Sequence, residues 1–280
     1  SPTSATPDTL YYYCSSHNLM GGTITVTDST GSDGKIATQP FAMFKGDGTS
    51  AAGGPTQRQG VSAYGANSYF YDGTDMLRTS QAMVGGGTTK GDNFDFGKED
   101  FTIEYWEYPT AIGDHNWTLG FGDANGNRIF EGYYNSPAST FNLVYGLNNS
   151  SSPNFGAEPM NTDQWTHVAI QGRWNQGTGN IEIWFNGSLQ NTSPSFTSPL
   201  TKLSTISTGS PALYLGSHYA TAAYNGYFDS WRISKGIARY GYSGTNAKLG
   251  TNAVHHSHCK LLITSNTFNG NTHFDDFSDQ

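Results

Sequence analysis

The sequence predicts an all-β protein whose main part is an antiparallel sandwich. Aromatic residues make up 14% of the chain and glycines number 35, whereas charged residues reach only 13%. This mixture favours strands and turns over surface helices. Short segments in which apolar and polar residues alternate then recur along the chain, separated by clusters of Gly, Asn, Ser and Pro. Such a series is typical of a sandwich. The segments cover residues 68–73, 101–109, 117–123, 128–134, 141–147, 165–174, 181–188, 212–217 and 226–234.

Two of these segments allow finer predictions. In residues 101–108 both alternating sets contain apolar side chains, so we expect this strand to be covered on both faces. Glu104 and Glu107 are three residues apart, which puts them on opposite faces of the strand. We expect both to be solvent-facing or capping carboxylates. The segment 181–187 ends in Asn186 and Gly187, a pair that predicts a hairpin turn.

The chain divides into three parts. Residues 9–27 read as strand, loop and strand, and a polar stretch follows, so we assign residues 1–39 to an N-terminal β-hairpin and linker. Residues 40–250 hold the alternating segments and form the predicted sandwich. Residues 251–280 supply a C-terminal strand and a tail.

Charge and hydropathy exclude two kinds of partner. The net charge is −8 and there is no basic cluster, which argues against nucleic acid, because phosphate binding needs Lys and Arg gathered on one face. There is no run of about 18 apolar residues, so we expect no membrane insertion. The first residues also lack the charged start and apolar core of a signal peptide.

Four motifs carry a resemblance to a known family. They are residues 68–79, 96–109, 163–190 and 213–240, and the last contains the run GYFDSWRI from Gly226 to Ile233. In this order, over roughly residues 60–245, they resemble the laminin-G-like and pentraxin-like branch of the concanavalin-A-like proteins. The resemblance implies a jelly-roll sandwich.

The end of the chain resembles a narrower group. The run SKGIARY at residues 234–240, followed by KLLITSN at residues 260–266, is similar to laminin-G-like modules in structural proteins of marine tailed bacteriophages. In those chains a K-L-L strand opens each module, so residues 260–266 either open a further module or close this one. The resemblance implies a virion location, other virion proteins as partners, a homo-oligomer and a host-surface glycan as a ligand. A secreted protein is the alternative.

The segment YYYCSSHNLMGG raises the question of a metal site. Cys14, His17 and Met20 are spaced as in the C-terminal hairpin of cupredoxins, where thiolate, imidazole and thioether bind copper. A cupredoxin needs a second histidine from an earlier strand, about 40 residues upstream, and only 13 residues precede Cys14. A zinc site would add Cys259 and a histidine from residues 255–258. We expect a structural turn that requires no cofactor. The alternatives are a copper or zinc site and a disulfide bridge between Cys14 and Cys259.

A second candidate is a calcium loop. Asp123, Asn125 and Asn127 alternate as oxygen ligands do in such loops, but the twelfth position holds Tyr134 rather than a glutamate. The same residues are those that a tight β-turn requires. We expect the turn and keep calcium as the alternative.

No catalytic motif is found in the sequence. Neither the Glu-x-Asp-x-x-Glu run of glucanases with this fold nor a G-x-S-x-G elbow is present. We therefore predict a non-catalytic virion structural or appendage protein, such as a capsid decoration or tail fibre, that binds protein or glycan through loops at the sandwich rim. The alternatives are a secreted carbohydrate-active enzyme or binding module, and a metalloprotein. Aromatic rings near turns are the candidate ligand-binding groups, because exposed rings stack on sugars: Tyr133, Tyr134, Trp174, Tyr219 and Tyr224.

Overall fold

The chain forms two compact units, Ser1–Gln39 and Pro40–Gln280. The computed structural model describes residues 9–13, 21–25, 41–45, 55–63, 67–79, 93–113, 115–123, 125–135, 140–146, 155–159, 161–206, 211–218, 221–222, 224–241 and 258–263. In the first unit β1 (Thr9–Tyr13) pairs antiparallel with β2 (Gly21–Thr25), as the alternation predicts. Cys14, His17 and Met20 fall outside the described residues. Among the described residues, no helix has the length and hydropathy of a membrane span.

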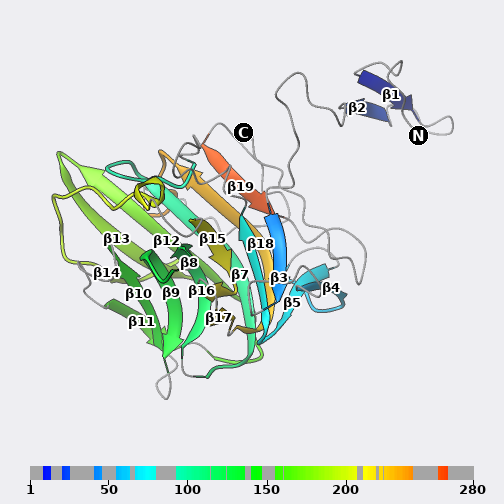
Figure 1. Ribbon diagram of the computed structural model, residues 1–280, viewed down its shortest axis with the longest axis horizontal. Helices are drawn as coiled ribbons and strands as arrows, with labels where there is room; N and C mark the ends of the chain where they lie inside the picture. Colours follow the sequence, from blue (N-terminus) through cyan, green and yellow to red (C-terminus); the bar gives the residue numbers. More distant parts are fainter. Residues whose placement is uncertain are drawn as a thin grey trace. The chain divides into compact units, whose positions relative to one another are not determined.

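The second unit consists mainly of two large antiparallel sheets, shown in Figure 1. A seven-stranded sheet has, in spatial order, β11 (Phe155–Pro159), β10 (Thr140–Tyr145), β9 (Arg128–Asn135), β8 (Asn116–Gly122), β15 (Ala212–Leu215), β6 (Asp75–Thr79) and β3 (Phe41–Lys45). An eight-stranded sheet has β14 (Ser188–Thr192), β13 (Thr178–Phe185), β12 (Thr166–Asn175), β7 (Phe101–Ala111), β18 (Asn225–Lys235), β5 (Asn67–Asp72) and β4 (Thr56–Gln59), with β19 (Cys259–Ile263) also paired to β18. The short β16 (Ser217–His218) and β17 (Thr221–Ala222) pair with each other, and Leu203–Thr205 form a 3-10 helix. The predicted antiparallel jelly-roll sandwich is confirmed.

One hydrophobic core fills the space between the sheets, and β7 shows how the alternation builds it. Phe101, Ile103 and Tyr105 belong to this core, while the residues between them lie on the outer face of the eight-stranded sheet. Every residue from Phe101 to Glu107 is buried, which confirms that this strand is covered on both faces.

Two tight turns set the ends of the hairpins in the eight-stranded sheet. Asn186 and Gly187 both have positive φ, 51° and 80°, as a two-residue type I′ turn requires, and they join β13 to β14. The Asn-Gly hairpin prediction is therefore confirmed. Gln176 and Gly177 make the same turn between β12 and β13, with φ of 50° and 84°. A glutamine at positive φ is unusual, and alternation alone gives no sign of it.

Strand β18 carries a bulge that divides its outer edge between two partners. Ser230 has a φ of 53°, and Asp229 fixes the bulge by accepting hydrogen bonds from the N–H of Ala63 and the hydroxyl of Ser230. Before the bulge β18 pairs with β5, and after it with β19. The K-L-L strand of the sequence therefore pairs within this sandwich.

After β18 the chain turns back over the outer face of the eight-stranded sheet. We call residues 236–241 the strap. The N–H of Tyr240 donates to the side-chain oxygen of Gln171 at 3.0 Å, and the amide nitrogen of Gln171 donates to the carbonyl of Tyr240, also at 3.0 Å. This pair of bonds joins the strap to β12.

Candidate functional site

A hollow of about 630 Å³ lies at the hairpin between β12 and β13. Its size is within the range of small-molecule sites, and its lining is mostly polar. Arginine, asparagine, glutamine and hydroxyl side chains lie beside one tryptophan: Arg173, Trp174, Asn175, Gln176, Thr178, Gly179, Asn180 and Ser195. We call this hollow the hairpin pocket.

The backbone around the hairpin pocket is fixed by pairing at its rim. Gly179 exchanges two backbone hydrogen bonds with Phe196, at 2.7 and 2.9 Å, and the N–H of Trp174 donates to the carboxylate of Asp100 at 2.7 Å. A Cβ on Gly179 would lie 2.8 Å from the Trp174 ring and 2.9 Å from the Phe196 ring. A glycine is therefore needed for these rings to approach the hairpin.

Trp174 is the aromatic residue of the pocket lining. It packs edge-on against Phe196, with ring centroids 5.3 Å apart at 80°, and the Lys98 ammonium lies 5.6 Å from its centroid. Two buried polar atoms in the lining have no hydrogen-bond partner in the structure, the indole Nε1 of Trp174 and the Oδ1 of Asn180. Unsatisfied buried groups are rare in proteins and often occur at functional sites. Here one donor and one acceptor of this kind belong to the lining of a single pocket.

The charged group in the pocket lining is held in place by a relay. The Nε of Arg173 donates to Glu182 Oε1 at 3.0 Å. The other oxygen of Glu182 accepts from the amide of Gln171 at 2.6 Å and from the indole of Trp184 at 3.0 Å. Because Gln171 is also bonded to the strap, the relay joins the strap to the pocket.

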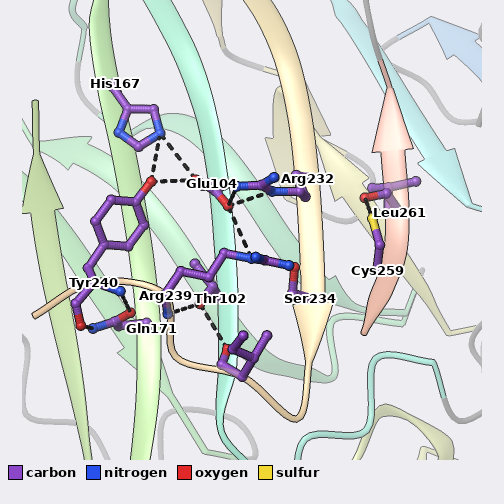
Figure 2. A network of polar contacts seen from close by, with 11 residues as sticks. Thr102, Glu104, His167, Gln171, Arg232, Ser234, Arg239, Tyr240, Cys259 and Leu261 are labelled. Carbon is purple, nitrogen blue, oxygen red and sulfur yellow. Dashed lines mark hydrogen bonds and ion pairs between the residues drawn. The ribbon is translucent and has the colours of Figure 1, made fainter. Parts of the chain in front are cut away.

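A second polar network lies beside this relay and is drawn in Figure 2. The carboxylate of Glu104 accepts two bonds from Arg232, at 2.6 and 2.7 Å, and one from the Tyr240 hydroxyl at 2.5 Å. His167 Nε2 lies 3.4 Å from the same carboxylate, and Arg239 Nε lies 3.7 Å from it. This buried network connects β7, β12, β18 and the strap.

The two glutamates of β7 have opposite electrostatic environments. Burial alone would raise the pKa of Glu104, but the hydrogen bond from His167 and the charge of Arg232 lower it to about 2. On the core face, burial raises the pKa of Glu107 to about 8, although hydrogen bonds from Tyr134 and Tyr224 lower it in part. The two side chains do lie on opposite faces of the strand. The expectation that they are solvent-facing or capping carboxylates is wrong, because both are completely buried.

The outer face of the seven-stranded sheet carries a cluster of stacked rings. The Trp117 ring stacks on the ring of His218, with centroids 4.0 Å apart, and its centroid lies 4.6 Å from that of Tyr133 and 5.7 Å from that of His115. His218 Nε2 is 3.4 Å from Glu131. Burial is the main cause that lowers the pKa of His218 to about 3 and raises that of Glu131 to about 7, so both groups are shifted toward their neutral forms. His218 is therefore neutral at pH 7, and the cation that pairs with Glu131 is Arg128, whose Nη1 lies 3.3 Å from the other carboxylate oxygen.

The structure separates the predicted aromatic residues. Trp174 lies in the hairpin pocket, and Tyr133, only 8% exposed, lies in the ring cluster of the other sheet. Tyr134 and Tyr224 are completely buried in the core, where Tyr134 donates a hydrogen bond to Glu107. The expectation of exposed rings is therefore wrong for Tyr133, Tyr134 and Tyr224. Tyr219 is outside the described residues.

The predicted calcium residues form a closed turn. One oxygen of Asp123 accepts from the N–H groups of Asn125 and Asn127, at 3.0 and 2.9 Å, and the other accepts from the Asn127 amide at 2.8 Å. Both carboxylate oxygens thus bind groups of their own loop. Among the described residues, no cluster of three or more His, Cys, Asp or Glu side chains could hold a metal ion.

This arrangement gives a testable prediction for Asp123. The variant Asp123→Ala is expected to lower the free energy of unfolding by about 1 to 3 kcal/mol, because it removes three bonds from the turn. Addition of calcium or of a chelator should shift the melting temperature of either form by less than about 1 °C. A stabilisation by calcium that the variant abolishes would instead identify a cation site.

The zinc alternative is only partly within the described residues. The thiol of Cys259 is buried in β19, where its Sγ donates to the carbonyl of Leu261 at 3.3 Å (Figure 2). The Nδ1 of His258 lies 3.1 Å from the carbonyl of Lys235. The remaining candidate ligands of that site lie outside the described residues.

Sequence reasoning found Trp174 but not the other residues of the pocket. Arg173 and Asn180 face each other across the β12–β13 ladder, and Glu182 faces Gln171 in the same ladder. That register could have been inferred from a turn at Gln176 and Gly177. Gln-Gly is not a strong turn signal, so these pairs were not predicted.

The fold is a lectin-like β-sandwich. The chain belongs to the concanavalin A-like lectin and glucanase superfamily, since the laminin-G family model described by that name matches residues 84–238, more than half of the chain. No curated protein sequence matches it.

Three solved structures are similar at low sequence identity. A candidate carbohydrate binding protein from Bacteroides ovatus is 17% identical, with a TM-score of 0.45 and coverage of 60% of this chain and 46% of that one. Tailspike protein 2 of the Escherichia coli O157:H7 bacteriophage CAB120 is 14% identical, with a TM-score of 0.46 and coverage of 73% and 27%. The heptameric SAP-like pentraxin of Limulus polyphemus is 14% identical, with a TM-score of 0.40 and coverage of 70% and 85%. The chain thus spans less than half the length of the first two.

Proposed function

We propose that this protein is a non-catalytic glycan-binding module and that the hairpin pocket is its binding site. The observation that carries the proposal is the composition of the pocket, whose lining combines amide, hydroxyl and guanidinium side chains with one tryptophan, Trp174. Sugars present hydroxyl groups at their edges and apolar C–H groups on their faces, and such a lining can bind both.

We further propose that the module is part of a virion, as a capsid decoration or a tail appendage, and that it acts as a homo-oligomer that contacts other virion proteins. This part rests on the phage-like runs at residues 234–240 and 260–266. Membership of a lectin-like superfamily supports a binding role, although a fold alone does not determine function. A host-surface glycan is then the natural ligand, with a secreted binding module as the alternative.

A glycan array followed by titration of the strongest ligand tests the binding role. The variant Trp174→Ala is expected to weaken that binding by at least about tenfold, because a central aromatic ring commonly supplies much of the energy of a binding site. Trp165→Ala is the matched control, since Trp165 is also partly buried and lies just before the opposite end of β12. Both variants should keep the β-sheet circular dichroism spectrum of the parent protein.

The outcomes separate binding from architecture. No bound glycan at high protein concentration would overturn the binding role and leave a purely architectural one. Equal loss of binding in the two tryptophan variants would show a general effect on the fold, and would remove the hairpin pocket as the site.

A further inference from the structure

The lining of the hairpin pocket contains a cation and no carboxylate, although the chain as a whole is acidic. The whole chain carries a net charge of −8, yet Arg173 is the one charged residue among the pocket lining residues, and no carboxylate is among them. The ammonium of Lys98 lies over the neighbouring Trp174 ring and adds a second positive charge beside the pocket. The carboxylates of Glu182 and Asp100 lie next to this lining, bonded to Arg173 Nε and to the backbone N–H of Trp174, so an anionic ligand would meet the Arg173 guanidinium itself rather than an excess of positive charge.

The guanidinium of Arg173 is pre-organised. Glu182 accepts from its Nε at 3.0 Å, and Glu182 is itself held by Gln171 and Trp184. A guanidinium is a planar fork with five N–H donors, so it can serve a fixed protein carboxylate and a ligand anion together. Because its geometry is set before binding, less side-chain freedom is lost when a ligand binds.

The strap completes the support of this arginine. A Cβ on Gly241, the last residue of the strap, would lie 2.7 Å from Arg173 Nη2 and 3.2 Å from the Trp184 ring. Gly241 has a φ of 82°, a conformation that side chains other than glycine rarely adopt. The strap therefore packs directly against the guanidinium, and it is also bonded to Gln171 in the relay.

We propose that the hairpin pocket selects a sugar bearing a carboxylate or a sulfate, with Arg173 as the anion-binding residue and Glu182 as its positioning residue. This inference rests on the proposed glycan-binding function and names its ligand class. A charge-assisted bond from a fixed guanidinium to an anion exceeds a neutral hydrogen bond in strength. Neutral sugars of the same shape should bind more weakly.

The test compares charged and neutral forms of the same oligosaccharide. The probes for calorimetric titration are oligogalacturonate, its carboxyl-reduced neutral form, a sulfated galactan oligosaccharide and its desulfated form. The unmodified protein is expected to bind at least one charged probe roughly tenfold more tightly than its neutral form, a difference of about 1.4 kcal/mol. The better charged probe distinguishes a carboxylate ligand from a sulfate ligand.

Three variants assign that preference to the relay. Arg173→Gln should bring the ratio of charged to neutral affinity close to one, and Glu182→Gln should reduce it in part. Arg58→Gln is the charge-matched control, because Arg58 is an exposed cation on β4, at the other end of the sheet from the hairpin, and its loss should leave the ratio unchanged. If Arg173→Gln does not fold, Arg173→Lys replaces it and should lower the ratio several-fold, since lysine lacks the planar fork.

The outcomes keep the two proposals apart. Equal affinity for the charged and neutral forms, or an unchanged ratio in Arg173→Gln, would overturn the anion selectivity while leaving glycan binding in place. An unchanged ratio in Glu182→Gln would overturn the positioning role alone. Absence of binding to all four probes and to the glycan array would overturn both proposals.

Discussion

Replacement of Glu104 by glutamine is expected to lower the free energy of unfolding at pH 7 by about 3 to 5 kcal/mol, the usual cost of removing one partner from a buried ion pair. The Arg232 guanidinium, which donates to Glu104 at 2.6 and 2.7 Å, would then remain in the buried outer-face network without a counter-charge. For a unit of this size the melting temperature should fall by about 10 °C. Urea unfolding followed by tryptophan fluorescence measures the difference.

The contribution of Glu104 to the free energy of unfolding should be lost at acidic pH. Its pKa is about 2 in the folded protein, below the ordinary value of 4.5, so its contribution is complete above pH 4.5 and is lost as the pH falls toward 2. The two proteins should therefore become similar in stability near pH 2. Glu99→Gln is the control, since Glu99 is 56% exposed and lies 3.4 Å from Lys235, and its loss should cost less than about 1 kcal/mol. Equal effects of the two variants at pH 7 would contradict the prediction.

Replacement of Glu107 by glutamine is expected to stabilise the protein at alkaline pH. The pKa of Glu107 is about 8 in the folded protein, above the ordinary value of 4.5, so the folded state keeps its proton while the unfolded state has lost it. Wild-type stability therefore falls as the pH rises from 4.5 to 8. At about 1.4 kcal/mol per pH unit, the variant should gain roughly 3 to 5 kcal/mol relative to the wild type above pH 8, with little difference at pH 4.

The measurement is again urea unfolding, at pH 4, 6 and 9 for both proteins. Other titrating groups are common to the two proteins, so their contributions largely cancel in the difference. The amide carbonyl that the Glu107→Gln variant introduces can still accept the hydrogen bond that Tyr134 donates to Glu107, which keeps the packing of the core. A stability difference that does not change with pH would show that Glu107 is ionised in the folded core, and would sink this prediction.

Alternation in the sequence was sufficient to predict the layers of the fold. Period-two patterns such as residues 101–109 and 181–188 locate strands whose side chains divide cleanly between core and outer face, and Asn186 with Gly187 predicts its turn from local chemistry. Each of these features depends on neighbours in the sequence. Such features are the ones that a single sequence can reveal.

Long-range polar contacts were not predictable in this way. Glu104 is buried because Arg232 and Tyr240, more than a hundred residues later, bring donors to it. A glutamate in a half-polar strand gives no sign of partners at that distance. The same reason explains why Trp174 could be named as a candidate but Arg173, whose role depends on the relay to the strap, could not.

Because β18 pairs with β5 before its bulge and with β19 after it, the choice of C-terminal end matters for any expressed fragment. The family match ends at residue 238, but β19, at Cys259–Ile263, pairs with the stretch of β18 that follows its bulge. A fragment that stops at residue 238 would leave the backbone N–H and C=O groups from Trp231 to Ser234 without the strand that pairs with them. Open edges of this kind recruit strands from other molecules, so such a fragment would tend to self-associate, whereas one that extends beyond residue 263 carries its own protecting strand.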